Sequence, residues 1–375
     1  MKTFYLENEP LHFLEGIVAR NTPVRPMTVR TLSSRNLIPT DWNDTEFDLE
    51  YADREVRINF RRPVNDPHFR VDLTGDVPDT LVFNFRVHAG IEESALAPFL
   101  KSRRIIFLGC ARNCEKHVKA SILALSNLGA HFKDWRIGVF ENDSTDSTHQ
   151  ALSRLSGRFG LTVLRESGVD EHIPLRTARI AYGRNQLLSW ARTQGPADYL
   201  CFADLDGIVN QDLSVEGFLS SFRYEAVWDG VFPVNDDFCY DIYTVRQKDI
   251  AARDYRKAME AVDASIGKDL ARWLEGHSKL LDLRGMAGWL PVNSAFGGMG
   301  LYKYRAIIDG RYVGLDSGND EVCDHVSVNE NIVRRGGRLY INPEFVVVPF
   351  ADPEDWKGAV AGGYWNSRHW RRRQD

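Results

Sequence analysis

Two aspartates, Asp204 and Asp206, directly follow the apolar run at residues 199–202. Carboxylates two residues apart, just past a buried strand, can bind one hard divalent cation, and Mg²⁺ or Mn²⁺ bound there also accepts phosphate oxygens. Such a cation offsets the charge of a departing diphosphate. An Asp-x-Asp triplet is also common in loops, but its place after a strand favours a metal site. Gly207 adds support, because it lets backbone approach a ligand closely.

A second polar cluster, Glu141, Asn142 and Asp143, follows another apolar run. Its side chains can accept hydrogen bonds from a base N–H and from ribose hydroxyls, so we expect a nucleoside contact. Helix capping is the alternative, with Asp146 or Ser147 as the N-cap. Capping explains the residues at the helix start, whereas Glu141, Asn142 and Asp143 precede the cap, and we therefore favour a role for them in binding a nucleoside.

Two further pairs of basic and amide side chains lie near predicted strand ends. Arg112 and Asn113 follow the first apolar run and precede a helix, a position that suits base and phosphate contacts. Arg184 and Asn185 lie in the helix before the Asp-x-Asp strand, and an arginine fork suits a diphosphate. A surface arginine or a solvated charged face is the alternative for each pair. The first loop has no G-x-G-x-x-G pattern, which argues against a dinucleotide cofactor.

Two acids, Glu321 and Asp324, lie just before the helix predicted at 326–335 and are candidates for the reacting centre. One of them could act as a general base on an acceptor hydroxyl, or stabilise an oxocarbenium-like transition state. They could equally complement the helix dipole. His325 could be a metal ligand or a capping partner. In the basic, aromatic tail, His369 could reach the metal if the tail folds over a pyrophosphate, and a disordered solubilising end is the alternative.

Strand–helix alternation from residue 103 onward would position these side chains. Continuous apolar runs, as expected of parallel strands buried on both faces, predict strands at 104–109, 135–140, 161–164 and 199–202. Patterns with apolar steps of three and four predict helices at 115–128, 182–191 and 326–335. The order predicts a doubly wound, Rossmann-like α/β sheet. In such sheets ligands bind beyond the carboxyl ends of the strands, where the polar clusters lie.

Residues 1–100 have a different pattern and are expected to form a β-rich accessory segment. Short alternating runs at 55–60 and 80–87 are separated by clusters of proline and aspartate. No catalytic signature occurs there. We therefore divide the chain into the accessory segment 1–100, an α/β domain 101–350 and a C-terminal tail 351–375.

Composition narrows the function classes. The formal net charge of −5 gives no global positive field for nucleic acid. No stretch approaches 18 uninterrupted apolar residues, so we expect no membrane span. The N-terminal residues do not read as a signal peptide, and five scattered cysteines read as free thiols in a reducing compartment. We expect a cytoplasmic protein, with a peripheral place at the inner membrane face as the alternative.

The motifs, in their order, resemble glycosyltransferases of the GT-A fold, and within them the fungal capsule-associated α-mannosyltransferase family and its bacterial relatives. The resemblance covers about residues 103–350. It is carried by FENDSTDST (140–148), RIAYGRN (179–185), FADLD (202–206), FCYDIY (238–243), the Gly297-Gly298 segment, CDH (323–325) and YINP (340–343). Here both aspartates of the metal motif are present, whereas those relatives often carry a degenerate one.

The resemblance implies transfer of a sugar from a nucleotide diphosphate, GDP-mannose in that family, to a hydroxyl of a glycan or glycolipid acceptor. It also implies retention of anomeric configuration, and it places Asp241 beside Asp324 near the transferred sugar. Two alternatives remain open. One is an inverting transferase of the same fold with a UDP-sugar donor and Glu321 or Asp324 as base. The other is a non-catalytic glycan-binding protein on a degenerate transferase scaffold.

Overall fold

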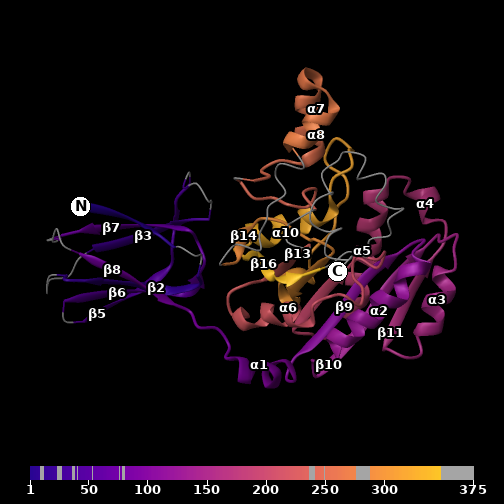
Figure 1. Cartoon of the computed structure of the whole chain (residues 1–375), viewed down its shortest axis with the longest axis horizontal. Coiled ribbons are helices and arrows are strands. Elements are labelled where there is room, and N and C mark those ends of the chain that lie inside the picture. The colour runs from indigo at the N-terminus through magenta and orange to yellow at the C-terminus, as the bar shows by residue number, and fades with distance from the viewer. Residues whose placement is uncertain are drawn as a thin grey trace, which may run out of the picture.

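The computed structural model describes residues 1–8, 12–22, 28–35, 39, 41–52, 54–75, 77, 81–235, 241–248, 250–275 and 288–347. Within them, one large mixed sheet dominates the chain after residue 103 (Figure 1). Its strands are β9 (Arg104–Ala111), β10 (Asp134–Asn142), β11 (Leu161–Glu166), β12 (Tyr199–Ala203), β13 (Gly230–Val234), β14 (Leu290–Val292), β15 (Met299–Lys303) and β16 (Leu339–Val346).

The strand order in this sheet is β11-β10-β9-β12-β15-β13-β16-β14. Strands β11, β10, β9 and β12 are mutually parallel. Strand β15 runs antiparallel to both of its neighbours, β12 and β13. At the far edge β16 is parallel to β13, and β14 is antiparallel to β16. The sheet is therefore mixed, with a parallel half that contains the predicted ligand-binding edge.

Helices cover both faces of the sheet, because its strands are apolar on both sides. Ile105 and Phe107 of β9 point into one core and Ile106 and Leu108 into the other. Helix α2 (Glu115–Gly129) packs on the first face, and α5 (Arg176–Thr193) packs on the second. The remaining helical segments are α1 (Glu93–Leu100), α3 (Thr148–Leu155), α4 (Val169–His172), α6 (Val215–Ser220), the 3₁₀ turn η1 (Ser221–Tyr224), α7 (Tyr255–Ile266), α8 (Lys268–Glu275), α9 (Tyr304–Ile307) and α10 (Asp324–Arg334).

The N-terminal segment forms two four-stranded antiparallel sheets, with orders β1-β7-β3-β4 and β5-β6-β2-β8. Their shared core includes Ile17, Ile58, Phe69 and Val71. The strands are β1 (Lys2–Glu7), β2 (Leu14–Arg20), β3 (Thr28–Ser34), β4 (Asn43–Asp44), β5 (Phe47–Ala52), β6 (Glu55–Val64), β7 (His68–Thr74) and β8 (Val82–Val87).

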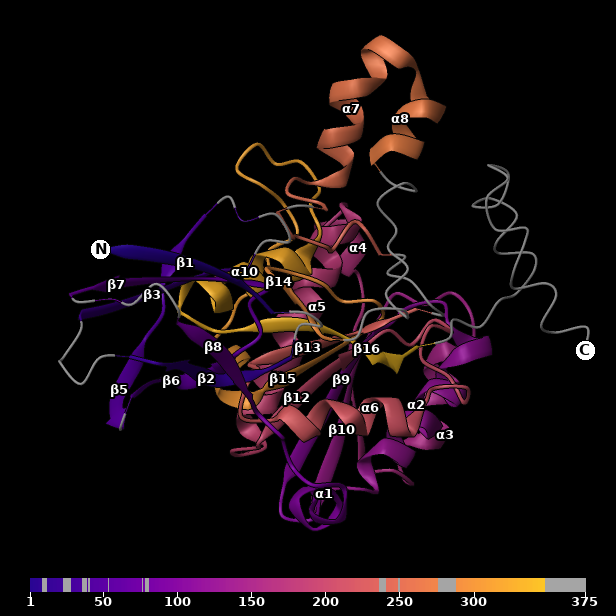
Figure 2. The ribbon, with the colours of Figure 1, turned by 60° about the vertical axis from the view of Figure 1, so that its left-hand side comes forward.

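The β-rich segment packs against the far edge of the large sheet, next to β14 and β16 (Figures 1 and 2). The buried ring of Phe13 lies 5.4 Å, centroid to centroid, from both Trp289 and Tyr340. Arg62 forms an ion pair with Asp229 at 2.9 Å. The contact is thus both apolar and charged. In both views α7 and α8 project from the opposite end to α1.

The predicted fold class is confirmed: a mixed α/β sheet has helices on both faces and a β-rich segment precedes it. The predicted strands at 104–109, 135–140, 161–164 and 199–202 all occur, extended by one or two residues at their ends. Helix α5 begins at Arg176, six residues before the predicted start. Its N-cap, Leu175, makes no side-chain capping bond, so the sequence contains no start signal there.

Helix α10 likewise begins two residues earlier than predicted, at Asp324. This difference matters because it places Asp324 and His325 in the first turn, where both side chains are buried. Among the described residues, no helix combines the length and apolar character needed to cross a bilayer.

Candidate functional site

The order of the parallel strands defines where a ligand would bind. The chain passes from β9 outward to β10 and β11, and then returns to the other side of β9 as β12. In open α/β sheets the crevice at such a reversal, beyond the carboxyl ends of the strands, is the usual ligand site. Arg112 follows β9 and Asp204 follows β12, so both lie at this reversal.

Arg184 links two of the predicted site residues across the crevice. From α5 its guanidinium donates to Asp324 at 2.5 Å and to Asp204 at 3.3 Å. The side chains of Arg184 and Asp324 are 9% and 6% exposed, whereas that of Asp204 is 33% exposed. The structure therefore brings together residues 140 positions apart. It leaves part of Asp204 open to solvent.

The carboxylates outnumber the cation in this cluster. Burial and the negative charge of Asp206 raise the pKa of Asp204 well above its ordinary value, although Arg184 opposes the shift. Burial alone would lower the pKa of Arg184. The negative charges around it, chiefly those of Asp324 and Asp204, together outweigh burial and raise this pKa above its ordinary value, so the guanidinium stays charged. An added cation would relieve this excess of negative charge.

Asp241 belongs to the same electrostatic cluster, since its charge adds to the upward shift of the Asp204 pKa. Burial raises the pKa of Asp241 itself to about 6, against hydrogen bonds from Thr244 and from the backbone of Gly297. The neighbouring Gly298 accepts a hydrogen bond from the backbone N–H of Asp204 at 2.9 Å. A short backbone segment therefore joins the surroundings of Asp241 and Asp204.

Gly298 must be glycine for this arrangement. Its φ is +89°, and a Cβ there would lie 2.1 Å from the Cγ2 atom of Ile208. Gly207 has φ +107° and closes the turn after the aspartate pair. Both positions need the left-handed backbone that glycine adopts freely.

The loops after β9 and β10 are cross-linked by side chains. Asn113, at φ +52°, accepts from the backbone N–H of Thr145 at 2.7 Å and donates its own backbone N–H to Ser144 at 3.1 Å. The backbone N–H of Cys114, just before α2, donates to the hydroxyl of Thr148 at 2.8 Å, and that of Glu115, the first residue of α2, donates to Asp146 at 3.1 Å. Asn113 thus links the loops after β9 and β10, and these amides already have hydrogen-bond partners within the protein.

The predicted nucleoside residues after β10 differ in their surroundings. Glu141 is buried, with one oxygen 3.4 Å from Arg165, and the Asn142 side chain is also buried. Asp143, at φ +50°, accepts from the backbone N–H groups of Gly168 and Asp170 at 2.6 and 3.1 Å. Desolvation would raise the pKa of Asp143, but a hydrogen bond from the Asn142 side chain, the two backbone hydrogen bonds and the charge of Arg112 together lower it.

Arg112, Asn185 and Glu321 each bind another part of the chain. Arg112 forms an ion pair with Asp170 at 2.5 Å. The Asn185 amide binds both backbone groups of Tyr312, each at 2.9 Å. Glu321 accepts from the backbone N–H and the hydroxyl of Thr177, at 2.9 and 3.1 Å, and these contacts lower its pKa.

The described residues contain no group of three or more His, Cys, Asp and Glu side chains arranged to hold a metal ion. Asp204 and Asp206 are close enough for their charges to interact, and Asp206 is exposed. The predicted third ligand, His369, lies outside the residues that the structure describes, as does the whole tail. The pair can therefore offer two carboxylates, with remaining ligands from phosphate and water. His325 is buried with its ring stacked on Phe296 at 3.6 Å.

Sequence reasoning missed the residues that hold Arg184 in place. The Cζ atom of Arg184 lies 5.2 Å from the Phe296 ring centroid and 5.7 Å from that of Tyr312. Cation–π attraction to rings adds to its ion pairs. Phe296 directly precedes Gly297-Gly298, one of the motifs that carry the family resemblance. Nothing in the sequence around Tyr312 indicates a contact with the site.

Comparison with known proteins gave only distant likenesses. Protein-family models and curated proteins gave no match. Among solved structures, mannosyltransferase PcManGT from Pyrobaculum calidifontis, in complex with GDP-Man and Mn²⁺, is similar at 15% identity and a TM-score of 0.41. The match covers 68% of this chain and 60% of that one.

Two other solved structures show a comparable likeness. A mycobacterial protein matches at 13% identity over 75% of this chain and 77% of its own, with a TM-score of 0.42. Glucosyl-3-phosphoglycerate synthase from Mycobacterium tuberculosis, in complex with UDP, matches at 15% identity over 73% and 82%, with a TM-score of 0.37. TM-scores below 0.5 do not establish function, so the strand order and the side chains carry the argument.

Proposed function

We propose that the chain is a GT-A glycosyltransferase that moves a sugar from a nucleotide diphosphate to a hydroxyl of a glycan or glycolipid acceptor. One observation carries this proposal. Asp204 and Asp206 follow a buried parallel strand at the reversal of strand order, and Arg184 contacts Asp204 there. Carboxylates at this position suit a cation-bound diphosphate, because the sheet directs ligands to this edge.

The residues fit a divalent cation in charge and in ligand type. Asp204, Asp206, Asp241 and Asp324 interact electrostatically around Arg184, so the cluster has an excess of carboxylates. We propose that Asp204 and Asp206 would hold Mn²⁺ or Mg²⁺ together with phosphate oxygens. The cation would supply charge compensation for the departing diphosphate. His369 remains a candidate ligand from the tail.

The nucleotide would lie across the carboxyl ends of β9 and β10. Glu141 and Asn142 are the candidates for contact with the base and ribose, because their polar atoms end β10 at the crevice. Arg112 is the candidate for the phosphates. We give Asn113, Asp143 and Asn185 supporting roles, since the backbone groups that they bind fix the loops and Tyr312 around the crevice.

Of the three candidate acids near the sugar, Asp241 is the one we propose to face the anomeric carbon. A carboxylate there would stabilise positive charge on the sugar in the transition state. Asp324 orients Arg184 through their ion pair, and Glu321 anchors the start of α5 through Thr177. We propose that these two act as positioning residues. The mannosyl donor and the retaining outcome implied by the capsule-family resemblance remain predictions.

The experiment that tests the proposal is titration calorimetry with GDP and with UDP, each with and without Mn²⁺. Wild-type protein should bind one nucleotide more tightly with Mn²⁺ present, by at least tenfold. Asp204→Ala combined with Asp206→Ala should abolish that Mn²⁺-dependent gain. Asp212→Ala, which removes an exposed aspartate six residues beyond Asp206, is the matched control and should bind as wild type does.

Nucleotide binding unchanged by the double substitution would refute the metal assignment. A panel of nucleotide sugars, assayed for slow donor hydrolysis, would then identify the donor. Product configuration, read by NMR, would distinguish a retaining from an inverting reaction. Carbohydrate binding without metal dependence or donor hydrolysis would instead identify a glycan-binding protein.

A further inference from the structure

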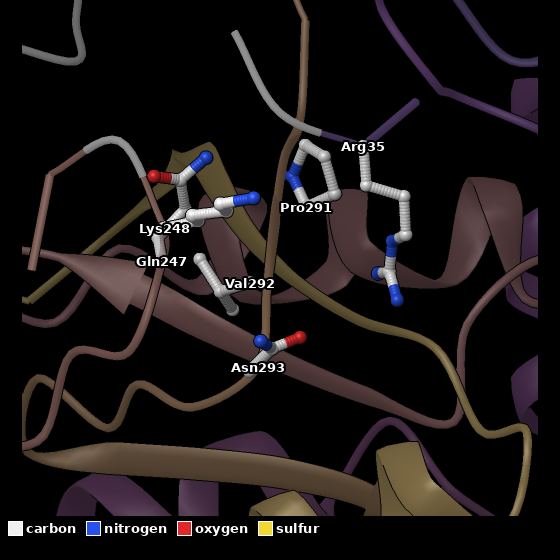
Figure 3. Close-up of a pocket in the computed structure, with 6 residues that line it drawn as sticks. All are labelled: Arg35, Gln247, Lys248, Pro291, Val292 and Asn293. Carbon is white, nitrogen blue, oxygen red and sulfur yellow. The ribbon is translucent and has the colours of Figure 1, made fainter. Parts of the chain in front are cut away.

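A small pocket lies where the β-rich segment meets the large sheet, apart from the candidate active site. Three chain segments meet there, and Figure 3 shows their side chains around Pro291. Its lining residues are Arg35, Gln247, Lys248, Pro291, Val292 and Asn293. Arg35 follows β3 of the β-rich segment, and the other five come from the large sheet and the loop beside it.

The chemistry of this pocket suits a small oxyanion. It combines the cations of Arg35 and Lys248 with the amides of Gln247 and Asn293. Among the residues that the structure describes, the buried Nη2 atom of Arg35 has no hydrogen-bond partner. A buried, unsatisfied donor on a charged group is costly, and a planar guanidinium pairs best with a carboxylate or phosphate. An anion in the pocket would compensate the charge of this guanidinium.

Aromatic side chains that suit a sugar lie next in the chain to, or in contact with the neighbour of, the ion-pair partner of Lys248. Lys248, 44% exposed, forms an ion pair with Asp41, whereas no ion pair of Arg35 occurs among the residues that the structure describes. Asp41 precedes Trp42, whose ring lies 5.9 Å from that of Tyr5, and Tyr5 is 68% exposed. Aromatic rings offer an apolar face beside a polar edge, against which the C–H face of a pyranose can pack.

One short backbone segment connects the pocket with the candidate active site. It runs from Asn293, in the pocket, to Gly298, whose carbonyl accepts from the Asp204 N–H at 2.9 Å. Five residues of fully extended chain span at most about 18 Å. The pocket and the backbone beside Asp204 are therefore at most about 18 Å apart along this segment, a separation that a short oligosaccharide could span.

We infer that this pocket binds a carboxylate or phosphate group carried by the acceptor glycan, and that acceptor binding is a role of the β-rich segment. The inference rests on the proposed function for the identity of the acceptor. The oxyanion itself is recognised by Arg35, with Lys248 and Asn293 as neighbours.

The test is an NMR titration of the full chain with four probes: inorganic phosphate, mannose 6-phosphate, glucuronic acid and uncharged mannose. The two acidic sugars should bind at least tenfold more tightly than mannose and inorganic phosphate. Arg35→Gln should weaken acidic-sugar binding at least tenfold. The control Arg61→Gln removes an arginine of the same segment whose ion pair with Asp48 is exposed, and should stay within twofold of wild type.

Lys248→Gln is the second variant, in case Arg35→Gln does not fold, and should weaken acidic-sugar binding severalfold. Acidic-sugar binding that survives in folded Arg35→Gln or in Lys248→Gln would overturn the inference. So would mannose binding as tightly as the acidic sugars. Inorganic phosphate binding as tightly as mannose 6-phosphate would overturn the assignment to a glycan.

Binding of GDP with Mn²⁺, measured on the same samples, keeps this inference distinct from the proposed function. Arg35→Gln should leave nucleotide binding unchanged, because Arg35 is not part of the candidate active site. If wild-type protein binds no nucleotide but binds acidic sugars through Arg35, the proposed function fails and the anion pocket stands.

Discussion

Arg184 holds a positive charge in a buried position between two carboxylates and close to the rings of Phe296 and Tyr312. This arrangement requires each partner, since an unpaired charge in a protein interior is strongly destabilising. The buried pair therefore has consequences for stability that are separate from any role in catalysis.

We predict that Asp324→Asn lowers the free energy of unfolding by about 2–4 kcal/mol, because the buried guanidinium loses its 2.5 Å charged partner. Urea denaturation measures this. Asp44→Asn, which breaks the exposed pair with Arg30, is the control and should change the stability far less, because solvent screens an exposed ion pair. Equal effects of the two substitutions would show that Arg184 does not depend on Asp324.

Asp241 leads to a prediction about pH. Its folded-state pKa of about 6 lies above the ordinary value of 3.8. A carboxyl with a raised pKa destabilises the folded state increasingly as pH rises from the unfolded to the folded pKa, and fully above it. Asp241→Asn should therefore raise the free energy of unfolding at pH 7.5 by about 1–2 kcal/mol, and by nothing below pH about 4.

Denaturant titrations at pH 4 and pH 7.5 measure this difference, with Asp48→Asn at the exposed Arg61 pair as the control. A variant less stable than wild type at pH 7.5 would contradict the prediction. If the proposed role of Asp241 is right, the same variant also loses transfer activity, so stability and activity change in opposite directions.

At the scale of elements, the buried parallel strands could be predicted from sequence. In a strand such as β9 every position from Ile105 onward is apolar, because both faces of the strand are covered, and such runs can be recognised in the sequence. The start of α5 could not be predicted, because its first turn has no capping side chain. The insertion of antiparallel β15 between β12 and β13 depends on pairings between distant segments, which local patterns do not encode.

The same contrast holds for the candidate site. The aspartates after β12 were recognised because a polar pair after an apolar run is a local signal. Their link to Asp324 through Arg184 spans 140 residues and has no local signal. The internal hydrogen bonds of Asn113 and Asn185 could not be predicted from the sequence either, because a side-chain amide can bind a ligand or a neighbouring backbone group equally well.

The cross-link between the loops after β9 and β10 gives a prediction at this scale. Asn113→Gly keeps access to the left-handed backbone but loses the hydrogen bond to Thr145, and should cost about 1 kcal/mol. Asn113→Ala loses the same bond and also strains the backbone, so it should cost about 1–2 kcal/mol more.

Thermal denaturation measures both variants, and hydrogen exchange at residues 144–147 should accelerate in each of them. If the alanine variant is as stable as the glycine variant, the backbone at residue 113 is not left-handed in solution.

For the whole molecule, the contact between the β-rich segment and the large sheet determines how the chain unfolds. Phe13 packs against rings of the large sheet in a largely buried contact. Phe13→Ala should lower the free energy of unfolding by about 3–5 kcal/mol. Calorimetric melting of wild type should show one transition, and the exposed control Tyr5→Ala should leave it almost unchanged.

A wild-type melt with two separate transitions, one of them indifferent to Phe13→Ala, would mean that the segment and the sheet fold independently. A single transition would mean that the β-rich segment and the large sheet unfold together. The proposed acceptor-binding and donor-binding parts of the enzyme would then keep a constant relative geometry in the folded state.

The guanidinium between Asp204 and Asp324 also has a consequence for handling the protein. Because Arg184 already neutralises part of that cluster from within, we expect folding not to depend on a bound ion, unlike that of small domains that unfold when zinc is removed. We expect an EDTA-treated sample to melt at the same temperature as an untreated one. Addition of Mn²⁺ with nucleotide should raise that temperature by mass action, so the purified polypeptide can be stored in chelator and loaded when required.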